Sequence, residues 1–196
     1  MRILTVVDYD EMWPTLFENE RTLLQMTLGK VISRIHHIGS TSVPGLSAKP
    51  VIDILIEVAN LEELDSLNQA MEGVGYTVRG ENGILNRRYF TKGGNQRSHH
   101  IHAFTTGDAQ IIKHLALRDY LIKHNDVAIQ YALMKKARCY YVKMTATDTT
   151  FIKRISFRNI FVWRLLMRVT WASLQINYNP CFFCNFSQRY LWFLHY

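Results

Sequence analysis

The sequence is poor in cysteine and has no long apolar run. Its 196 residues include three cysteines, too few for a disulfide-stapled scaffold, so we expect a reducing compartment. No uncharged apolar stretch reaches the length of about 18 residues that a membrane-spanning helix needs. The N-terminal segment meets Asp8 and Asp10 too early to contain the apolar core of a signal peptide. These absences predict a cytoplasmic protein.

Acidic residues are missing from the C-terminal part of the chain. The last carboxylate is Asp148, and residues 155–196 carry four arginines and no acidic side chain. The same segment holds 12 of the 24 aromatic residues. This break in composition predicts a boundary near residue 154, with a domain over 1–154 and an atypical tail over 155–196. Because much of the net charge of +7 comes from the tail, the charge is weak evidence for nucleic-acid binding.

Three interpretations of residues 155–196 are open. Aromatic residues with arginine suit a membrane-surface or partner-binding appendage, and they also suit an arm that stacks on nucleic-acid bases. The third interpretation is unselected sequence, such as a shifted reading frame. We favour the third, because helical periodicity fades after about Arg168 and no motif replaces it.

The remainder of the chain has the patterning of an α+β protein. Apolar residues are 48% and charged residues 20% of the whole sequence, which excludes wholesale disorder. Periodicity, capping residues and glycines predict helices at 10–28, 60–74, 108–124, 125–140 and 148–168, and strands at 31–38, 50–58, 76–79, 85–91 and 99–104. Helices and strands in this order are typical of an α+β fold.

One loop and the strand after it carry the strongest chemical signal. Gly39, Ser40 and Thr41 end one predicted strand, and Asp53 stands inside the next, apolar strand. Glycine allows close approach of a phosphate, and the N–H groups and hydroxyls that follow can bind its oxygens. Asp53 and Glu57 share a face of the strand, being four residues apart. Two carboxylates beside such a loop would suit a divalent cation such as Mg²⁺ and would be the catalytic pair.

A purely structural interpretation of these residues is also open. The loop could be a plain turn, and Asp53 could pair with Lys49 or Arg34. For an isolated Gly-Ser loop and one aspartate we would favour this interpretation, because such spacing arises often by chance. Lys49, beside Pro50 at the mouth of the strand, could reach a phosphate or be a surface lysine.

The segment and its flanks resemble the GrpB family, a small group within the nucleotidyltransferase superfamily. The resemblance covers roughly residues 5–154 and is most specific at His37-Ile-Gly-Ser-Thr41 and Ala48-Lys-Pro50. Further similar segments occur in the expected order, and they are Trp13-Pro14, Asn86-Arg-Arg-Tyr-Phe90, Arg97-Ser-His-His-Ile-His102 and Leu117-Arg-Asp-Tyr-Leu121.

This resemblance implies a fold, a cofactor and a reaction. The fold would be a nucleotidyltransferase-like mixed sheet with helices packed on it and a C-terminal helical layer. The Gly-Ser loop would bind a nucleoside triphosphate, and strand carboxylates would hold Mg²⁺. The reaction would transfer a nucleoside monophosphate to an acceptor that the sequence does not identify. Family members fused to a dephospho-coenzyme A kinase domain point to nucleotide or coenzyme metabolism.

Two departures from the superfamily pattern concern the metal. Leu55 stands where the second carboxylate is expected, and Glu57 lies one strand period further along. The third carboxylate is replaced by the run His99-His-Ile-His102, which could also be an exposed edge strand. Because imidazole suits Zn²⁺ and Mn²⁺ better than Mg²⁺, those two ions are alternatives to an expected Mg²⁺. The expected metal ligands are Asp53, Glu57, His100 and His102.

Basic residues gather on two predicted strands and their turn. Arginine can bind a triphosphate through bidentate contacts, so we expect Arg87, Arg88 and Arg97 to contact phosphate, although for each alone a solvated face is the simpler interpretation. Arg118 and Asp119 are adjacent on a predicted helix, and we expect them to point to different faces and not to pair.

The expected function is metal-dependent nucleotidyl transfer from a nucleoside triphosphate, without nucleic acid as a partner. The rival is a non-catalytic nucleotide- or phosphate-binding module, and Leu55 is its best support. His114 has no ligand partner at helical spacing, so we expect it to be structural.

Overall fold

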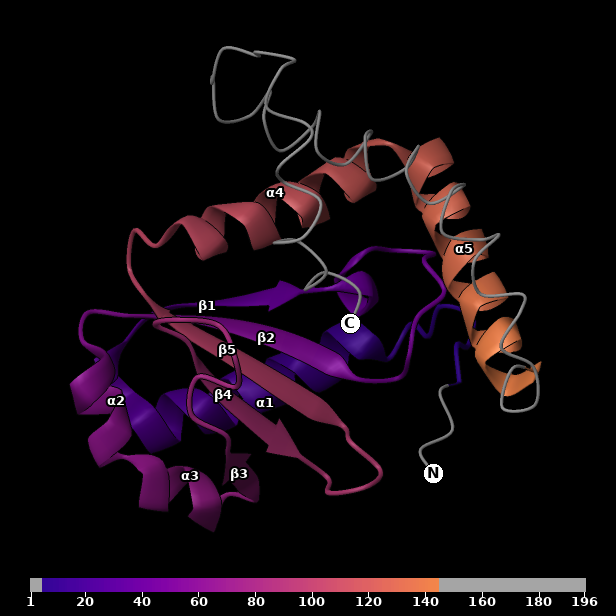
Figure 1. Cartoon of the computed structure of the whole chain (residues 1–196). Coiled ribbons are helices and arrows are strands. Elements are labelled where there is room, and N and C mark those ends of the chain that lie inside the picture. The colour runs from indigo at the N-terminus through magenta and orange to yellow at the C-terminus, as the bar shows by residue number, and fades with distance from the viewer. Residues whose placement is uncertain (1–4, 145–196) are drawn as a thin grey trace.

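The structure is a mixed β-sheet with helices on both faces (Figure 1). It is a computed structural model that describes residues 5–144, with side chains through residue 137. The helices are α1 (Trp13–Leu28), α2 (Leu61–Ser66), α3 (Asn68–Gly73), α4 (Ala109–Lys123) and α5 (Asn125–Met144). The strands are β1 (Ile32–Ile38), β2 (Ile52–Val58), β3 (Tyr76–Val78), β4 (Arg88–Lys92) and β5 (His99–Thr105). The predicted α+β class is confirmed, and the helix expected at 148–168 lies outside the described residues.

The five strands lie in the order β1-β2-β5-β4-β3. β2 and β5 are parallel, and every other neighbouring pair is antiparallel. The histidine run is therefore on a strand paired on both sides, and the interpretation of it as an exposed edge strand is wrong. The sequence pattern of consecutive strands indicates only that neighbours such as β4 and β5 pair. The long connection between β2 and β5 places β5 beside β2 as well, in the middle of the sheet.

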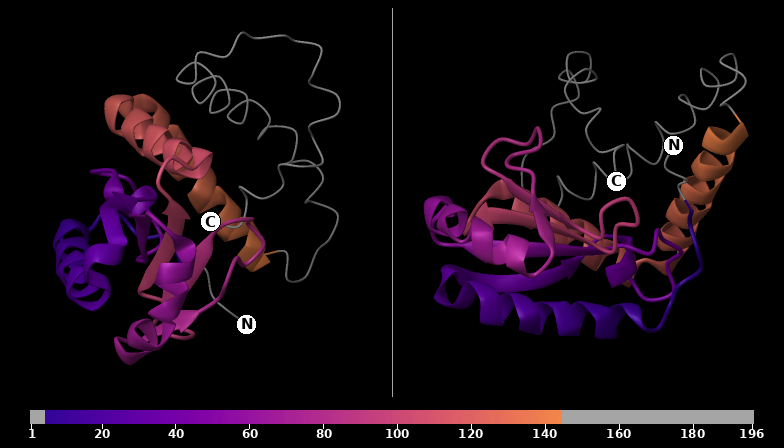
Figure 2. Two further views of the ribbon diagram at one scale, coloured as in Figure 1. Left: turned by 90° about the vertical axis from the view of Figure 1, so that its left-hand side faces the viewer. Right: turned by 90° about the horizontal axis from the view of Figure 1, so that it is seen from below.

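Alternation along β2 divides its side chains between two apolar layers. Ile52, Ile54, Ile56 and Val58 are buried against α1, whose Trp13, Phe17, Leu24 and Leu28 line the same core. Figure 2 shows α1 lying along one side of the sheet. On the other side, Leu55 packs with Ile38, Phe104 and Ile111 under α4. The side chains of Asp53 and Glu57 consequently point to the α4 side.

The last two helices form the expected C-terminal helical layer. α4 begins after Asp108, which caps it by accepting a hydrogen bond from the backbone N–H of Gln110 at 2.7 Å. The start of α5 packs on the loop between β1 and β2 through a second apolar cluster that contains Val43, Leu46 and Val127. α5 thus stands at the end of the sheet where β1 ends and β2 begins (Figures 1 and 2). Within residues 5–144, no helix has the length and apolarity needed to cross a membrane.

Two predicted elements differ from the structure in ways that have local causes. The helix expected at 60–74 is divided at Leu67, where φ is −97° and ψ is 9°. The strand expected from residue 85 starts at Arg88, because Asn82 and Asn86 have positive φ and the preceding residues fold into turns. Asparagine tolerates that conformation better than other non-glycine residues.

Candidate functional site

A tight turn after β1 brings the backbone of a glycine against the carboxylate of Asp53. Gly39 has φ of 74°, a left-handed conformation, and it is followed by the 3-10 turn Ser40–Ser42. Ile38, the last residue of β1, is the register partner of Asp53. A Cβ on Gly39 would lie 2.6 Å from Asp53 Oδ2, closer than any side chain tolerates. A side chain on residue 39 would force Asp53 or the turn to move, which favours glycine here.

The hydroxyl groups of the turn face in different directions. Thr41 is buried, and its Oγ1 lies 3.0 Å from His37 Nε2. Ser42 Oγ donates to the carbonyl oxygen of Gly39 at 2.6 Å. Both hydroxyls therefore stabilise the turn from within, which leaves Thr41 only its backbone for a phosphate. Ser40 Oγ faces α5 instead.

Two residues of α5 reach this serine. Lys135 Nζ donates to Ser40 Oγ at 2.5 Å, and Tyr131 shares a side-chain hydrogen bond with Ser40. The Lys135 ammonium also lies over the Tyr131 ring, 5.1 Å from its centroid. Burial raises the pKa of the Tyr131 hydroxyl, the interaction with Ser40 opposes this shift, and the negative charge of Asp53 adds to it. Ser40, Tyr131 and Lys135 thus belong to the surroundings of Asp53. The sequence pattern assigned neither α5 residue a role in the site, because their helical spacing is ordinary and the loop they contact is far away in the chain.

α4 fixes the end of β1 through an arginine. Arg118 Nη1 donates to the carbonyl oxygen of His37 at 3.1 Å. Arg118 Nε also donates to Asp119 Oδ1 at 2.8 Å, so the expectation that these neighbours do not pair is wrong. The arginine side chain is long enough to bend back along the helix. Burial lowers the pKa of His37 to about 4, with Asp53 opposing and Arg118 adding to the shift, and the ring is neutral at pH 7.

Asp53 is paired with a histidine on the neighbouring parallel strand. Asp53 and His100 are register partners on β2 and β5, and His100 Nδ1 lies 3.1 Å from Asp53 Oδ1. Both side chains are mostly buried, at 18% and 14% exposed. The other ring nitrogen, His100 Nε2, is buried without a hydrogen-bond partner among the described residues. The structure therefore brings together two of the expected metal ligands.

A deeper cluster continues from His100 along the same face. Arg87 Nη1 donates to His102 Nδ1 at 3.3 Å, and the guanidinium lies over the Tyr89 ring at 4.7 Å. The His114 ring of α4 lies beside His102 in a tilted arrangement, with centroids 5.6 Å apart. Burial is the main cause that lowers the pKa of His102 well below its usual value and that of His114 to about 4. Both imidazoles are consequently neutral at pH 7, and His114 lies in this cluster although the sequence suggested no ligand role for it.

Glu57 is separated from Asp53 and has its own partner. Two strand periods, about 13 Å, lie between their Cα positions, so the two carboxylates do not share one ion. Glu57 Oε1 accepts a hydrogen bond from His36 Nε2 at 2.7 Å. Leu55, between them, is fully buried in the apolar layer under α4. The expectation that Asp53 and Glu57 act as one catalytic and metal-binding pair is corrected by this spacing.

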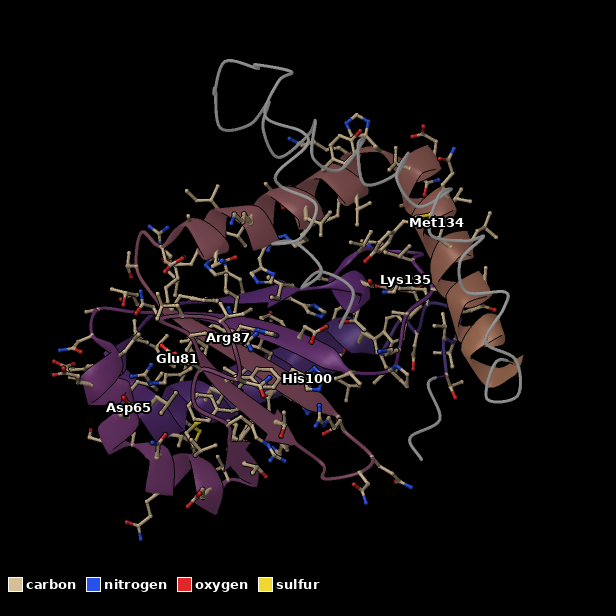
Figure 3. The ribbon with its side chains drawn as sticks, viewed as in Figure 1. Asp65, Glu81, Arg87, His100, Met134 and Lys135 are labelled. Carbon is tan, nitrogen blue, oxygen red and sulfur yellow. The ribbon has the colours of Figure 1, made fainter. Side chains whose placement is uncertain are left out.

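The expected phosphate-binding arginines do not converge. Arg88 makes a bidentate pair with Asp65 at 2.7 Å and faces the α1 side of the sheet, because it alternates with Tyr89 along β4. Arg87 is only 4% exposed, and its Nε and Nη2 donate to the carbonyl oxygens of Glu81 and Asn82. Arg88 thus lies on the face of the sheet opposite Asp53, and the N–H donors of Arg87 stabilise the turn that contains Glu81 and Asn82. Figure 3 shows Asp65 and Arg87 apart from Lys135.

The two remaining expected phosphate ligands flank the Asp53 end of the sheet. Lys49 is half-buried just before β2, and Arg97 is half-buried in the loop from β4 to β5, three residues before His100. Arg97 has no hydrogen bond or ion pair among the described residues. Of the basic residues singled out from the sequence, these two keep a position compatible with a ligand beside Asp53.

The side chains beside the turn suit a cation that takes its remaining ligands from a substrate. Within residues 5–144, no group of three or more His, Cys, Asp and Glu side chains is arranged to hold a metal ion by itself. Asp53 offers carboxylate oxygens, and His100 Nε2 is a buried nitrogen without a partner. Mg²⁺ is commonly bound through one or two carboxylates plus substrate phosphates, whereas an imidazole ligand favours Mn²⁺ or Zn²⁺.

The fold and the site define an α+β protein in which a Gly-Ser turn faces a strand aspartate across one end of a mixed sheet. The family model described as GrpB protein matches residues 3–155, and the chain belongs to the GrpB family. The crystal structure of GrpB from Enterococcus faecalis is similar with a TM-score of 0.73 and 33% identity, covering 87% of this chain and 99% of that chain.

Two further comparisons give more distant or partial matches. The UPF0157 protein YqkA of Bacillus subtilis is 47% identical over 135 residues, which are 69% of this chain and 39% of that protein. The chain thus spans about two fifths of that relative's length. A structure of the Cid1 poly(U) polymerase with MgGTP bound matches at 14% identity and a TM-score of 0.49, over 66% of this chain and 43% of that chain.

Proposed function

We propose that this GrpB domain binds a nucleoside triphosphate with a divalent cation and transfers the nucleoside monophosphate to an acceptor. The proposal is carried by the contact between the Gly39 backbone and the Asp53 carboxylate. A phosphate held by the turn would lie beside a cation held by Asp53, which is the arrangement in which Mg²⁺ is bound by a carboxylate and substrate phosphates together. The chain's membership of the GrpB family also supports the reaction class, because the resemblance described above implies a nucleotidyltransferase.

Each residue near the turn has a proposed task. The backbone of Gly39 and Thr41 and the hydroxyl of Ser40 bind phosphate oxygens, and Arg97 and Lys49 add positive charge from the flanks. Asp53 and His100 hold the cation, which, when bound, would withdraw negative charge from the phosphates. In the transfer, the acceptor oxygen bonds to the α-phosphorus and loses its proton to solvent, the bond from the α-phosphorus to the oxygen that bridges it to the β-phosphorus breaks, and pyrophosphate leaves with the electron pair of that bond.

A non-catalytic phosphate-binding module is the second candidate function. The observation in its favour is Leu55, fully buried where a second metal-binding carboxylate would stand. With Glu57 bonded to His36, β2 supplies a single carboxylate near the turn. Binding without turnover is the result this candidate predicts.

The binding half of the proposal is tested by calorimetry. We expect Asp53→Asn, which keeps the shape of the side chain but not its charge, to weaken Mn²⁺-dependent ATP binding by at least about tenfold. Glu57→Gln is the matched control on the same face of the same strand, and we expect it to bind like the unaltered protein. Equal binding by all three proteins would remove Asp53 from the site.

The catalytic half is tested by pyrophosphate release. The four ribonucleoside triphosphates are incubated with the protein and Mg²⁺ or Mn²⁺, together with mixtures of hydroxyl-bearing acceptors. Pyrophosphate formation that Asp53→Asn abolishes would support transfer. Tight nucleotide binding with no release under any of these conditions would favour the non-catalytic module.

A further inference from the structure

The turn at Gly39 and Ser40 contacts two opposite charges. Gly39 lies against Asp53, with the position of its missing Cβ 2.6 Å from Oδ2. The next residue, Ser40, accepts a hydrogen bond from the Lys135 ammonium. A carboxylate and an ammonium thus contact consecutive residues of one turn, although Lys135 follows Ser40 by 95 positions in the chain.

α5 holds the ammonium in this position by packing. Tyr131 and Lys135 are four residues apart and therefore lie on the same face of the helix. The Tyr131 ring lies under the Lys135 ammonium, 5.1 Å from its centroid, and so supports the ammonium beside Ser40. The side chain of Lys135 projects from α5 toward the strands (Figure 3). The adjacent Lys136 points elsewhere and pairs with Asp8, which is 87% exposed.

We propose that Lys135 is a phosphate-binding residue and that α5 thereby completes the nucleotide site with Tyr131 as its support. The inference rests on the proposed function and specifies its ligand. A cation on Asp53 beside Gly39 and an ammonium beside Ser40 complement a polyphosphate that carries a divalent metal. Such a ligand has one part that binds the metal and another that presents free oxygens. The N–H groups of Lys135 are charge-assisted donors, which bind phosphate oxygens more strongly than they bind a neutral hydroxyl. The site therefore selects a metal-bound triphosphate over a monophosphate.

The test uses the full chain with Mg·ATP, AMP and inorganic tripolyphosphate as probes. We expect Lys135→Met to weaken both ATP and tripolyphosphate by about tenfold or more, the equivalent of one charge-assisted hydrogen bond. AMP, with a single phosphate, should be affected less. Lys136→Met, which removes the same charge from the next position, should stay within about twofold of the unaltered protein for every probe. Lys135→Arg, which keeps the charge, should recover most of the tripolyphosphate affinity.

The outcomes separate this inference from the function on which it rests. If the unaltered protein binds neither ATP nor tripolyphosphate, the proposed function fails. If it binds both and Lys135→Met binds them equally well, the function stands and the role of Lys135 is refuted. A loss that is the same for ATP and AMP, comes with a lower melting temperature and is not rescued by arginine would assign Lys135 to support of the fold and would also overturn the inference.

Discussion

Asp53 shows how one side chain on an apolar strand acquires functional surroundings. Its two carboxylate oxygens have different neighbours: Oδ1 lies 3.1 Å from His100 Nδ1, and Oδ2 lies against Gly39. A charge in such a position is costly unless it is paired or binds a cation. The nearby His37 ring is neutral at pH 7, so it places no positive charge beside the carboxylate.

The closeness of Gly39 to Asp53 leads to a prediction. Gly39→Ala would place a methyl group on Oδ2, so Asp53 or the turn must move, and we expect Mn²⁺-dependent ATP binding to fall by about tenfold or more. In the structure the carboxylate occupies the space that a side chain on residue 39 would take, and the binding of phosphate by the Gly39 backbone stays a prediction. Calorimetric titration measures the change.

A second glycine provides the control for this experiment. Gly45 has φ of 75°, and nothing lies within 4 Å of a Cβ built on it. Gly45→Ala therefore introduces similar left-handed backbone strain without the clash. If the two variants bind alike, the contact with Asp53 has no importance for the ligand.

At the scale of elements, one buried carboxylate joins α1 to the far strands of the sheet. Glu20 of α1 accepts hydrogen bonds from Tyr76 of β3 at 2.9 Å and from Lys92 of β4 at 2.9 Å. His99 Nε2 of β5 is 3.8 Å from the same carboxylate. Burial is the main cause that raises the pKa of the Tyr76 hydroxyl, which remains protonated and able to donate. This network lies on the face opposite Asp53 and fixes the helix against three strands.

Removing its charge tests how much this network contributes to stability. We expect Glu20→Gln to lower the free energy of unfolding by about 1–3 kcal/mol, because the ammonium of Lys92 loses its partner in a mostly buried position. Glu18→Gln on the same helix breaks an exposed pair with Arg21 and should cost about 0.5 kcal/mol or less. Urea unfolding of both variants gives the comparison. Equal effects would show that the buried network adds nothing beyond a surface pair.

At the scale of the whole molecule, the site lies where α5 and the sheet meet, and the tail follows α5 in the chain. Residues 155–196 lie outside the described part, and the GrpB match ends at residue 155. With no carboxylate after Asp148 and half of the aromatic residues in the tail, this segment has little charge to keep it dispersed. The tail remains, on this composition, a proposed addition of unselected sequence to the GrpB domain.

Truncation after Arg168 tests that proposal. We expect the shortened protein to be more soluble and to bind Mg·ATP with unchanged affinity, because α5 with Lys135 is retained. Solubility is measured by sedimentation of lysates and affinity by calorimetry. Unfolding of the remaining domain, or a severalfold loss of affinity, would show that the tail is an integrated part of the protein.

Local signals in the sequence were sufficient for most of the fold. Asn60 and Asp108 cap α2 and α4 at the positions where helices were predicted to begin, and Gly29 ends α1. These features depend on residues within a few positions of one another, which is why they can be read along the chain. The turn after β1 and the apolar strand with Asp53 were predictable for the same reason.

The partners of Asp53 depend instead on the tertiary structure. His100 lies 47 residues away and meets Asp53 only because β5 inserts next to β2 in parallel. Glu57 shares the strand face but is kept apart by the rise of an extended chain, and Arg88 is turned to the other face by strand alternation. The sequence by itself determined the Gly-Ser turn and its carboxylate. The folded chain decided which residues face them, because contacts between distant segments depend on strand order and helix packing, which no local pattern encodes.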